Sequence, residues 1–437
     1  MNIHEHKKRQ KALLKAIGTN SAAIIPTATE KTRNRDADFA FRPDSDFFYM
    51  TGFNEPEAVA VFVPGRKQGQ YILFCRESNP LMEIWHGRRQ GLDGAKGSFQ
   101  VDEVFAIGKL DEILPTLLEN INRVYYNIGY DELFDKRLMG WVNKVRQKAR
   151  TGVLAPREFV LLDHLIHEMR LIKSSAEIKI MREACKISKK AHIKAMLTCK
   201  PGIREHVVEA ELNHTFTKHG CPAAYTSIVG GGENGCILHY TENNAELNDG
   251  DLLLIDAGAE LDCYASDITR TFPVNGKYSP AQKIIYEIVL AAQLAAIKKV
   301  KPGNHWNQPH EAAVKVLTQG LLDNGLLKGD LKKLIKDQAY NKFYMHRTGH
   351  WLGMDVHDVG DYKINGKWRK LEAGMVLTIE PGLYIAANTK GVAKKWWNIG
   401  IRIEDDVLVT KTGFDILSKD TPKTVREIET LMSGTNE

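Results

Sequence analysis

The sequence predicts an α/β (α+β) protein of two domains, the second of which is internally duplicated. The first observation is length, because 437 residues exceed the roughly 100 to 200 that one compact domain usually contains. The second is that strand-like runs alternate with amphipathic helical stretches along the chain. The third is an internal repeat between residues 247–258 and 371–382. We place the boundary near residue 172, which gives domains 1–171 and 172–437.

The composition is that of a folded protein with a mixed charged surface. Hydrophobic residues make up 43% and charged residues 26%, which excludes disorder over most of the chain. The net charge of +6 is a small surplus of 60 basic over 54 acidic residues, so we expect no nucleic-acid partner. The sequence shows neither an apolar leader nor an apolar run of about 18 residues, so we expect a cytoplasmic protein without a membrane partner.

The first domain is expected to mix strands and helices. Runs rich in aliphatic and aromatic residues predict strands over residues 22–25, 58–63 and 71–75. Pro64 and Gly65 separate the second run from the third and indicate a hairpin turn. Amphipathic stretches predict helices over residues 133–150 and 159–170. Gly152 and Pro156 would break the chain between these two helices.

A long helix is predicted to open the second domain. Ser174 and Glu177 have the spacing of a capping box, and the helical pattern continues to about residue 199. This helix and a later one both end in Lys-Pro-Gly. Each is followed by a helix-like stretch that closes on a glycine, Gly220 or Gly325, as a C-cap would. The same order of elements therefore occurs twice.

An acidic residue ends a buried strand in each half of the repeat. The run over residues 252–257 is apolar until Asp256, and Glu380 stands at the matching place in the second half. The next strand pattern, residues 264–272, contains Asp267, which could face Asp256 across an antiparallel pair. Taken alone, Asp256 would be a turn-capping residue. Its repetition as Glu380 favours a shared site instead.

A fourth acid lies on the strand predicted over residues 399–404. Isoleucines alternate with period two along this strand and place Arg402 and Glu404 together on the other face. A surface ion pair is the ordinary explanation of such a pattern. Because Glu380 and Glu404 repeat the pairing of the two aspartates, we expect all four carboxylates to meet.

Histidines gather near these acids. His346, His350 and His357 fall within one short segment, and His239 precedes the first acidic strand. The segment does not make the HExxH zinc helix, because Arg347 stands where the glutamate would be. A single histidine here would ordinarily be a hydrogen-bonded polar residue. A cluster beside four acids indicates ligands and proton carriers.

The acids and histidines together predict a metal centre. Four carboxylates in an apolar sheet would repel one another and take up protons unless cations neutralised them. Their formal charge matches two divalent cations, and an oxygen-rich set with one imidazole suits manganese or cobalt better than a thiolate-type zinc site. Two metals about 3.5 to 4 Å apart could hold a bridging water and lower its pKa towards about 7. The pattern therefore predicts metal-assisted hydrolysis.

Five of these residues, in this order and context, resemble the ligand set of the pita-bread metallopeptidases, the superfamily of methionine aminopeptidase, prolidase and aminopeptidase P. They are Asp256, Asp267, His350, Glu380 and Glu404. The segments that most resemble the aminopeptidase P family are residues 228–243, 267–276, 350–360 and 401–406. Residues 46–58 and 83–89 also look like that family's N-terminal domain. The resemblance implies a creatinase/prolidase-like mixed α/β domain followed by a pseudo-two-fold pita-bread catalytic domain.

The resemblance implies a role for each of the five residues. Asp256, Asp267, His350, Glu380 and Glu404 would hold two divalent cations, manganese first and cobalt or zinc as alternatives. Asp267 and Glu404 would bridge them. Glu380 would in addition act as a general base towards the attacking water.

The resemblance also implies residues that handle the peptide. The catalytic ones besides Glu380 would be His239, His357, His346 and Arg402. The substrate-binding ones would be Tyr384, Val356, His346 and Trp85. His239 and His357 would stabilise the tetrahedral intermediate and assist the leaving group, while Arg402 would orient the acids. Trp85 would reach a neighbouring subunit's site, which implies a homotetramer in which the N-terminal domain serves oligomerisation and site closure.

The implied activity is that of a metallo-aminopeptidase that cleaves the bond between an N-terminal residue and a following proline in Xaa-Pro-Yaa peptides. That bond lacks an N–H group, so peptidases that grip an extended chain through this donor lose their contact. Prolidase, which cuts Xaa-Pro dipeptides with the same ligands, is the alternative. A noncatalytic pita-bread binding module should have lost some of the five ligands. Arg347 departs from the family, in which a glycine often follows the first histidine.

Overall fold

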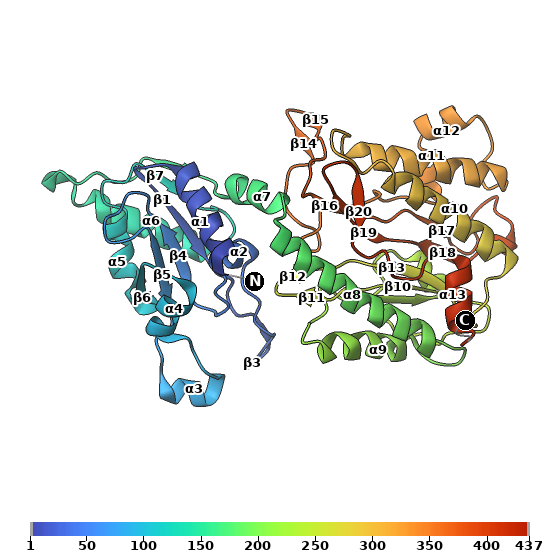
Figure 1. Cartoon of the computed structure of the whole chain (residues 1–437), viewed down its shortest axis with the longest axis horizontal. Helices are drawn as coiled ribbons and strands as arrows, with labels where there is room; N and C mark the ends of the chain where they lie inside the picture. Colours follow the sequence, from blue (N-terminus) through green and yellow to red (C-terminus); the bar gives the residue numbers. More distant parts are fainter. Residues whose placement is uncertain (1–2, 435–437) are drawn as a thin grey trace. The chain divides into compact units, whose positions relative to one another are not determined.

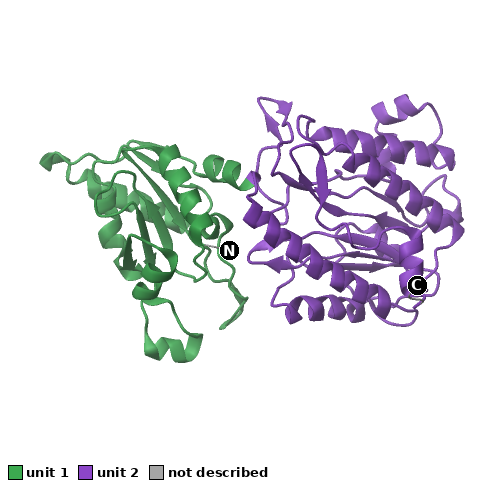
Figure 2. Cartoon of the chain, viewed as in Figure 1, with its two compact units in different colours: residues 1–170 green, residues 171–437 purple. Residues whose placement is uncertain are grey.

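The structure is a computed structural model that describes residues 3–434 (Figure 1). It contains two compact units, Met1–Arg170 and Leu171–Glu437, shown in Figure 2. Both units mix helices with strands, which confirms the predicted α/β class. The outermost residues of the two predicted domains, 1–2 and 435–437, lie outside the described residues. Within residues 3–434, every helix is too short or too polar to cross a bilayer.

A six-stranded sheet in the order β6-β5-β4-β1-β7-β8 forms the centre of the first unit. Its strands are β1 (Ser21–Pro26), β4 (Val59–Phe62), β5 (Tyr71–Cys75), β6 (Glu103–Ala106), β7 (Arg123–Tyr125) and β8 (Glu158–Val160). The predicted hairpin at Pro64 and Gly65 is confirmed, because β4 and β5 pair in antiparallel register. A smaller ribbon joins β2 (Thr32–Asn34) to β3 (Ala37–Asp38).

Seven helices of the first unit are described. They are α1 (Ile3–Ile17), α2 (Ser45–Thr51), α3 (Pro80–His86), α4 (Gly91–Phe99), α5 (Leu110–Leu117), α6 (Glu132–Arg146) and α7 (Asp163–Leu171). The helix expected over residues 159–170 begins late. Phe159 lies in β8 and pairs with Val124 in parallel register. The Asn127 side chain then accepts hydrogen bonds from the backbone N–H groups of Leu162 and Asp163, where the helix starts.

Helices in the second unit pack as pairs around small sheets. The helices are α8 (Ser175–Thr198), α9 (Glu205–Lys218), α10 (Pro280–Ile297), α11 (Asn307–Asp323), α12 (Leu331–Lys336) and α13 (Val425–Met432). Figure 1 shows the pair α8 and α9 on one side of the strands and the pair α10 and α11 on the other. The predicted capping box of Ser174 and Glu177 is confirmed at the start of α8. The repeat predicted a duplicated unit, and the resemblance implied the pita-bread fold, which this paired arrangement confirms.

The sheets of the second unit bring the two halves of the repeat together. The first-half strands are β9 (Ile228–Gly231), β10 (Leu252–Asp256), β11 (Glu260–Leu261), β12 (Tyr264–Ala265) and β13 (Thr269–Pro273). The second-half strands are β14 (Lys363–Ile364), β15 (Lys367–Trp368), β16 (Val376–Ile379), β17 (Gly382–Ile385), β18 (Ile399–Arg402), β19 (Asp405–Val409) and β20 (Phe414–Ile416). Antiparallel pairs β10–β13 and β16–β19 repeat the same design.

Two predicted strands are interrupted where they carry acids. The strand expected over residues 264–272 splits into β12 and β13, and Asp267 lies in the break. Asp256 therefore pairs with Thr269 rather than with Asp267. The break follows from a close backbone approach, because a Cβ on Gly258 would overlap the Ser266 carbonyl. The strand expected over residues 399–404 likewise ends at Arg402, before its acid.

Candidate metal centre

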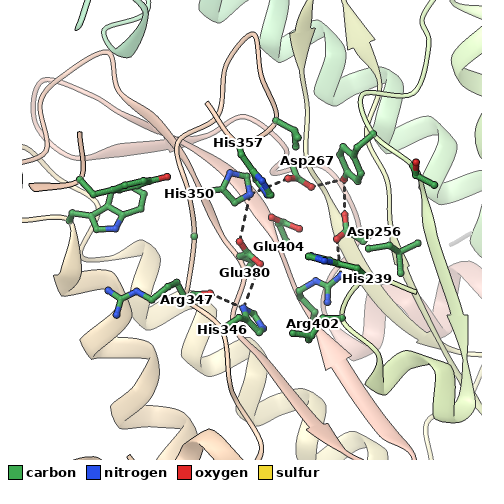
Figure 3. A pocket seen from close by; sticks show the side chains of 18 of the residues that line it. His239, Asp256, Asp267, His346, Arg347, His350, His357, Glu380, Arg402 and Glu404 are labelled. Carbon is green, nitrogen blue, oxygen red and sulfur yellow. Dashed lines mark hydrogen bonds and ion pairs between the residues drawn. The ribbon is translucent and has the colours of Figure 1, made fainter. Parts of the chain in front are cut away.

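A cavity of about 1080 Å³ in the second unit collects most of the predicted site residues (Figure 3). Those that line it are His239, Asp256, Asp267, His346, His350, Val356, His357, Glu380, Arg402 and Glu404. Tyr384 is buried behind this wall and forms a 2.9 Å hydrogen bond with His346. Trp85 belongs to the first unit, where its side chain on α3 is 81% exposed. The sequence segments that carry the acids and the histidines therefore meet at one place.

The centre of the cavity is a compact set of ligand atoms. One atom each from Asp267, His350 and Glu404 lies within 4.8 Å of the others. The Nε2 atom of His350 is 3.3 Å from Asp267 Oδ2 and 3.7 Å from Glu380 Oε1. Figure 3 shows Glu380 and Glu404 directed towards the same space. These four side chains come from separate segments of the chain and line the same cavity, so they can face one shared ion site.

Tyr225, which sequence reasoning missed, joins Asp256 to this set. Its hydroxyl lies 2.6 Å from Asp256 Oδ1 and 2.5 Å from Asp267 Oδ1. One hydroxyl carries a single proton, so it can donate to only one of the two carboxylates at a time. The Oδ1 atom of the other carboxylate then receives no proton from Tyr225. Nothing in the spacing around Tyr225 distinguishes it from a core tyrosine.

Buried contacts behind the cavity hold the ligand-bearing strands. The Arg270 guanidinium is fully buried and donates to Asp405 Oδ1 at 2.8 Å and to the Glu404 carbonyl at 2.5 Å. The Thr269 hydroxyl donates to Glu404 Oε2 at 2.6 Å. Asp405 also accepts from Lys423 at 2.6 Å. The position of Glu404 thus depends on residues that never reach the cavity.

The histidine-rich segment is held against β16 by backbone pairing. A Cβ on Gly349 would overlap the Thr378 carbonyl, so only glycine permits this approach. The neighbouring His350 then accepts a backbone hydrogen bond from Thr378 N–H at 2.9 Å. The imidazole of His357 lies edge-on to that of His350, with ring centroids 4.4 Å apart. This register aims both rings into the cavity.

Arg402 connects the acids to the opposite wall. Its guanidinium donates to Asp256 Oδ2 at 2.7 Å and to the Tyr384 hydroxyl at 3.0 Å. That hydroxyl in turn meets His346 Nε2, whose other ring nitrogen is 3.8 Å from Glu380. The sequence pattern placed Arg402 on the same face as Glu404, but not its bond to Asp256.

Comparisons with known proteins agree with this geometry. Residues 179–411 match the family described as "Metallopeptidase family M24", and residues 6–125 match "Aminopeptidase P, N-terminal domain". The chain belongs to metallopeptidase family M24. It is 44% identical to the Xaa-Pro aminopeptidase of Escherichia coli K12, over 98% of this chain and 97% of that protein.

Solved structures of M24 metallopeptidases are similar over the whole length of the chain. The structure of Pseudomonas aeruginosa aminopeptidase PepP gives a TM-score of 0.98 at 56% identity, and covers 99% of this chain and 98% of that one. A Zn-substituted Escherichia coli aminopeptidase P in complex with product gives 0.97 at 43% identity, and covers 100% of this chain and 99% of that one. The similarity therefore includes both units and the cavity.

The donor set of this M24 enzyme fits divalent cations. Burial, followed by repulsion from neighbouring carboxylates, raises the pKa of Asp256 and of Glu404 above the usual range of carboxyl groups. Burial likewise raises the pKa of Glu380 to about 7, against the lowering effect of His350 and Arg402. Burial also acts to raise the pKa of Asp267, but hydrogen bonds led by His350 outweigh it and lower the pKa. Cations would relieve this repulsion, and oxygen donors with one imidazole are the ligands they would meet.

Proposed function

We propose that this M24 metallopeptidase is an Xaa-Pro aminopeptidase, which releases the first residue from Xaa-Pro-Yaa peptides. The observation that carries the proposal is the buried meeting of four carboxylates and one imidazole beside a cavity lined by three further histidines. The names of the relatives support it. Two bacterial proteins that match this chain over 97% of their own length are named Xaa-Pro aminopeptidase. We further propose that the protein is cytoplasmic.

The proposed cofactor is a pair of divalent cations, with manganese expected first and cobalt or zinc as alternatives. Asp256, Asp267, His350, Glu380 and Glu404 would hold them, with Asp267 and Glu404 shared between the two. When bound, such cations polarise the scissile carbonyl and make water more acidic. Asp267, Glu404 and His350 lie together within the compact set of candidate ligand atoms.

Glu380 is proposed to take the proton of the attacking water. Its carboxylate lines the cavity beside the imidazoles of His350 and His346, at 3.7 and 3.8 Å, and so faces the space in which the water would be held. His239 and His357 line the same cavity and can donate to the developing oxyanion and to the departing proline nitrogen. Arg402 fixes the orientation of Asp256 through a 2.7 Å hydrogen bond.

The proline ring is proposed to sit against His346 and Val356, with Tyr384 supporting this wall from behind. His346 is held by its hydrogen bond to the Tyr384 hydroxyl, and burial lowers the pKa of His346 to about 3, which keeps this wall uncharged. An uncharged wall suits an apolar ring. The 1080 Å³ of the cavity also leaves space for residues beyond the proline, which favours longer peptides over Xaa-Pro dipeptides.

The deciding experiment compares three substrates after metal removal. Protein treated with chelator is expected to be inactive, and manganese is expected to restore release of the first residue from an Xaa-Pro-Yaa tripeptide. Cleavage of Xaa-Pro dipeptides with intact tripeptides would make the protein a prolidase. If the reloaded protein cleaves neither, while an Xaa-Ala-Yaa control is also intact, a noncatalytic binding module becomes the better account.

A further inference from the structure

Two basic side chains flank one tryptophan at the rim of the cavity. Arg347 and Lys363 both line it, together with Trp368. The Arg347 guanidinium lies 5.3 Å from the centroid of the Trp368 ring, and the Lys363 ammonium lies 4.3 Å from the same centroid. Both cations are exposed to solvent. The rim therefore presents two positive charges on one aromatic support.

Contacts with uncharged groups hold these basic side chains, so their positive charges remain. The Asn307 side-chain carbonyl accepts a hydrogen bond from the Arg347 guanidinium, and this contact adds no negative charge. Within residues 3–434, neither Arg347 nor Lys363 forms an ion pair with a carboxylate. The hairpin of β14 and β15 adds to the positive field, since residues 361–370 carry three exposed lysines, Lys363, Lys367 and Lys370, against one exposed acid, Asp361. Such a rim attracts anionic ligands.

The two cations lie where the far end of a substrate would emerge. Arg347 directly follows His346, whose imidazole bonds to Tyr384 on the proposed proline wall. Figure 3 shows the Arg347 side chain pointing away from Asp267 and Glu404. A peptide cut beside these carboxylates, with its proline at His346, would therefore carry its later residues towards the rim.

We propose that Arg347 and Lys363 select peptides that carry a carboxylate on the C-terminal side of the proline. The proposal rests on the Xaa-Pro aminopeptidase function above, and it names the substrate class that this chain prefers. The carboxylate comes either from an acidic side chain or from the free C-terminus of a short peptide. A planar guanidinium already oriented by Trp368 and Asn307 can donate two parallel hydrogen bonds to it.

The test measures kcat/KM of the manganese-loaded full-length enzyme on four peptides. They are Ala-Pro-Asp and Ala-Pro-Asn, each with a free C-terminus and with a C-terminal amide. Because exposed charge pairs are weak, we expect each carboxylate to raise kcat/KM by about threefold to tenfold. The gain is expected to shrink as salt rises from low to high ionic strength, since the interacting groups are exposed. Among the amidated peptides, the ratio of kcat/KM for the Asp peptide to that for the Asn peptide measures the effect of the side-chain carboxylate. The ratio of kcat/KM for the free acid to that for the amide measures the effect of the C-terminal carboxylate.

Variants then assign the preference to residues. Arg347→Gln and Lys363→Gln are each expected to lower the carboxylate ratios, and the double variant is expected to bring them to about 1. Arg347→Lys should keep part of the ratio because the charge remains. Lys332→Gln removes an exposed charge that does not line the cavity and should leave the ratios as in wild type.

Two outcomes overturn the proposal, and they differ from failure of the proposed function. Equal kcat/KM for all four peptides in the wild-type enzyme would show that the rim does not discriminate between charged and uncharged peptides. Ratios that persist in the double variant would assign the preference to other residues, and Arg347 would then serve only to pack against Trp368. Absence of cleavage of every Xaa-Pro peptide would instead contradict the aminopeptidase function itself.

Discussion

Glu380 lies in the wall of the cavity and faces the other proposed ligands. Its carboxylate lies 3.7 Å from His350 and 3.8 Å from His346, so it can exchange a proton within the site. A general base needs this kind of position, because it must lie within hydrogen-bond reach of the proton that it takes up. The side chain therefore differs from surface glutamates on the same segment in its chemistry as well as its position.

Glu380→Gln is expected to reduce kcat by at least about 100-fold, because a general base contributes roughly 10²- to 10⁴-fold. The measurement is steady-state cleavage of an Ala-Pro tripeptide in saturating manganese, with the melting temperature as a check on folding. Glu372→Gln is the matched control, since Glu372 is an exposed acid on the same segment. Wild-type kcat in the Glu380 variant would remove the proposed base.

Strands and helices in this protein are joined by buried charges as well as by apolar packing. Arg270 on β13 and Asp405 on β19 are both fully buried and 2.8 Å apart. Burial acts to raise the pKa of Asp405, but Arg270 and Lys423 outweigh it and lower the pKa to about 2. The pair is therefore ionised at all ordinary pH values, and removal of one partner leaves the other charge buried and unpaired.

Asp405→Asn is expected to destabilise the protein by about 3 to 5 kcal/mol and to weaken manganese binding, because Arg270 also holds the backbone of Glu404. Denaturant unfolding and calorimetric metal titration measure the two effects. Asp415→Asn provides the contrast, since Asp415 pairs with Arg182 at 2.7 Å in a partly exposed setting, where the cost should be below about 1 kcal/mol. Equal effects of the two substitutions would contradict the special position of Asp405.

Helices α2 and α7 of the first unit share a second charged cluster. Asp46 lies 2.8 Å from Arg170 and 3.3 Å from His167. Burial opposes the charge on both groups, but their mutual hydrogen bond outweighs it, so the pKa of Asp46 is lowered and that of His167 is raised. The imidazole is thus protonated to a higher pH in the folded protein than in the unfolded chain.

His167→Gln is expected to destabilise the protein most at low pH. The stabilising contribution of a raised imidazole pKa is fully present below the unfolded value of about 6.5 and is lost as pH rises through the folded value. Asp46 stays ionised over this range because its pKa is lowered. Urea unfolding of wild type and variant at pH 6 and pH 9 should show a difference at pH 6 that is largely gone at pH 9. A difference independent of pH would mean that His167 acts only through packing.

At the scale of the whole molecule, α3 offers a surface for assembly. Figure 1 shows this helix at the end of a loop that extends from the sheet of the first unit. Its four exposed apolar side chains are Leu81 at 74%, Met82 at 39%, Ile84 at 78% and Trp85 at 81%. Exposed apolar patches of this kind mark interaction sites in soluble proteins. The resemblance to the aminopeptidase P family implies a homotetramer in which Trp85 reaches the cavity of a neighbouring subunit, and we propose that this patch makes that contact.

Ile84→Lys is expected to shift the protein from tetramer to smaller species in sedimentation analysis and to lower kcat/KM, because burial of a lysine charge opposes the contact. Leu133→Lys on α6 is the matched control, since Leu133 is also 78% exposed. A wild-type protein that sediments as a monomer would contradict the assembly, and would leave the aminopeptidase proposal untouched.

The repeat made the acids predictable, but not the contacts that position them. Asp256 and Glu380 could be found because duplication placed an acid after the same apolar strand twice. The break around Asp267 could not, because it arises from the approach of Gly258 to Ser266 in three dimensions. The sequence pattern does not distinguish Arg270 from other strand residues, because its contact with Asp405 forms only in the folded protein. The domain boundary near residue 172, in contrast, is placed from length and pattern alone and stays a prediction.

The division of the proposed ligands between two halves has a consequence for folding. Asp256 and Asp267 come from the first half of the repeat, and His350, Glu380 and Glu404 from the second. An ion held by both acts as a removable cross-link between distant stretches of polypeptide, comparable to a disulfide that forms only in the native state. Since a ligand bound only by the folded chain stabilises it by mass action, the same ions that serve hydrolysis would couple the lifetime of the folded protein to the supply of free metal.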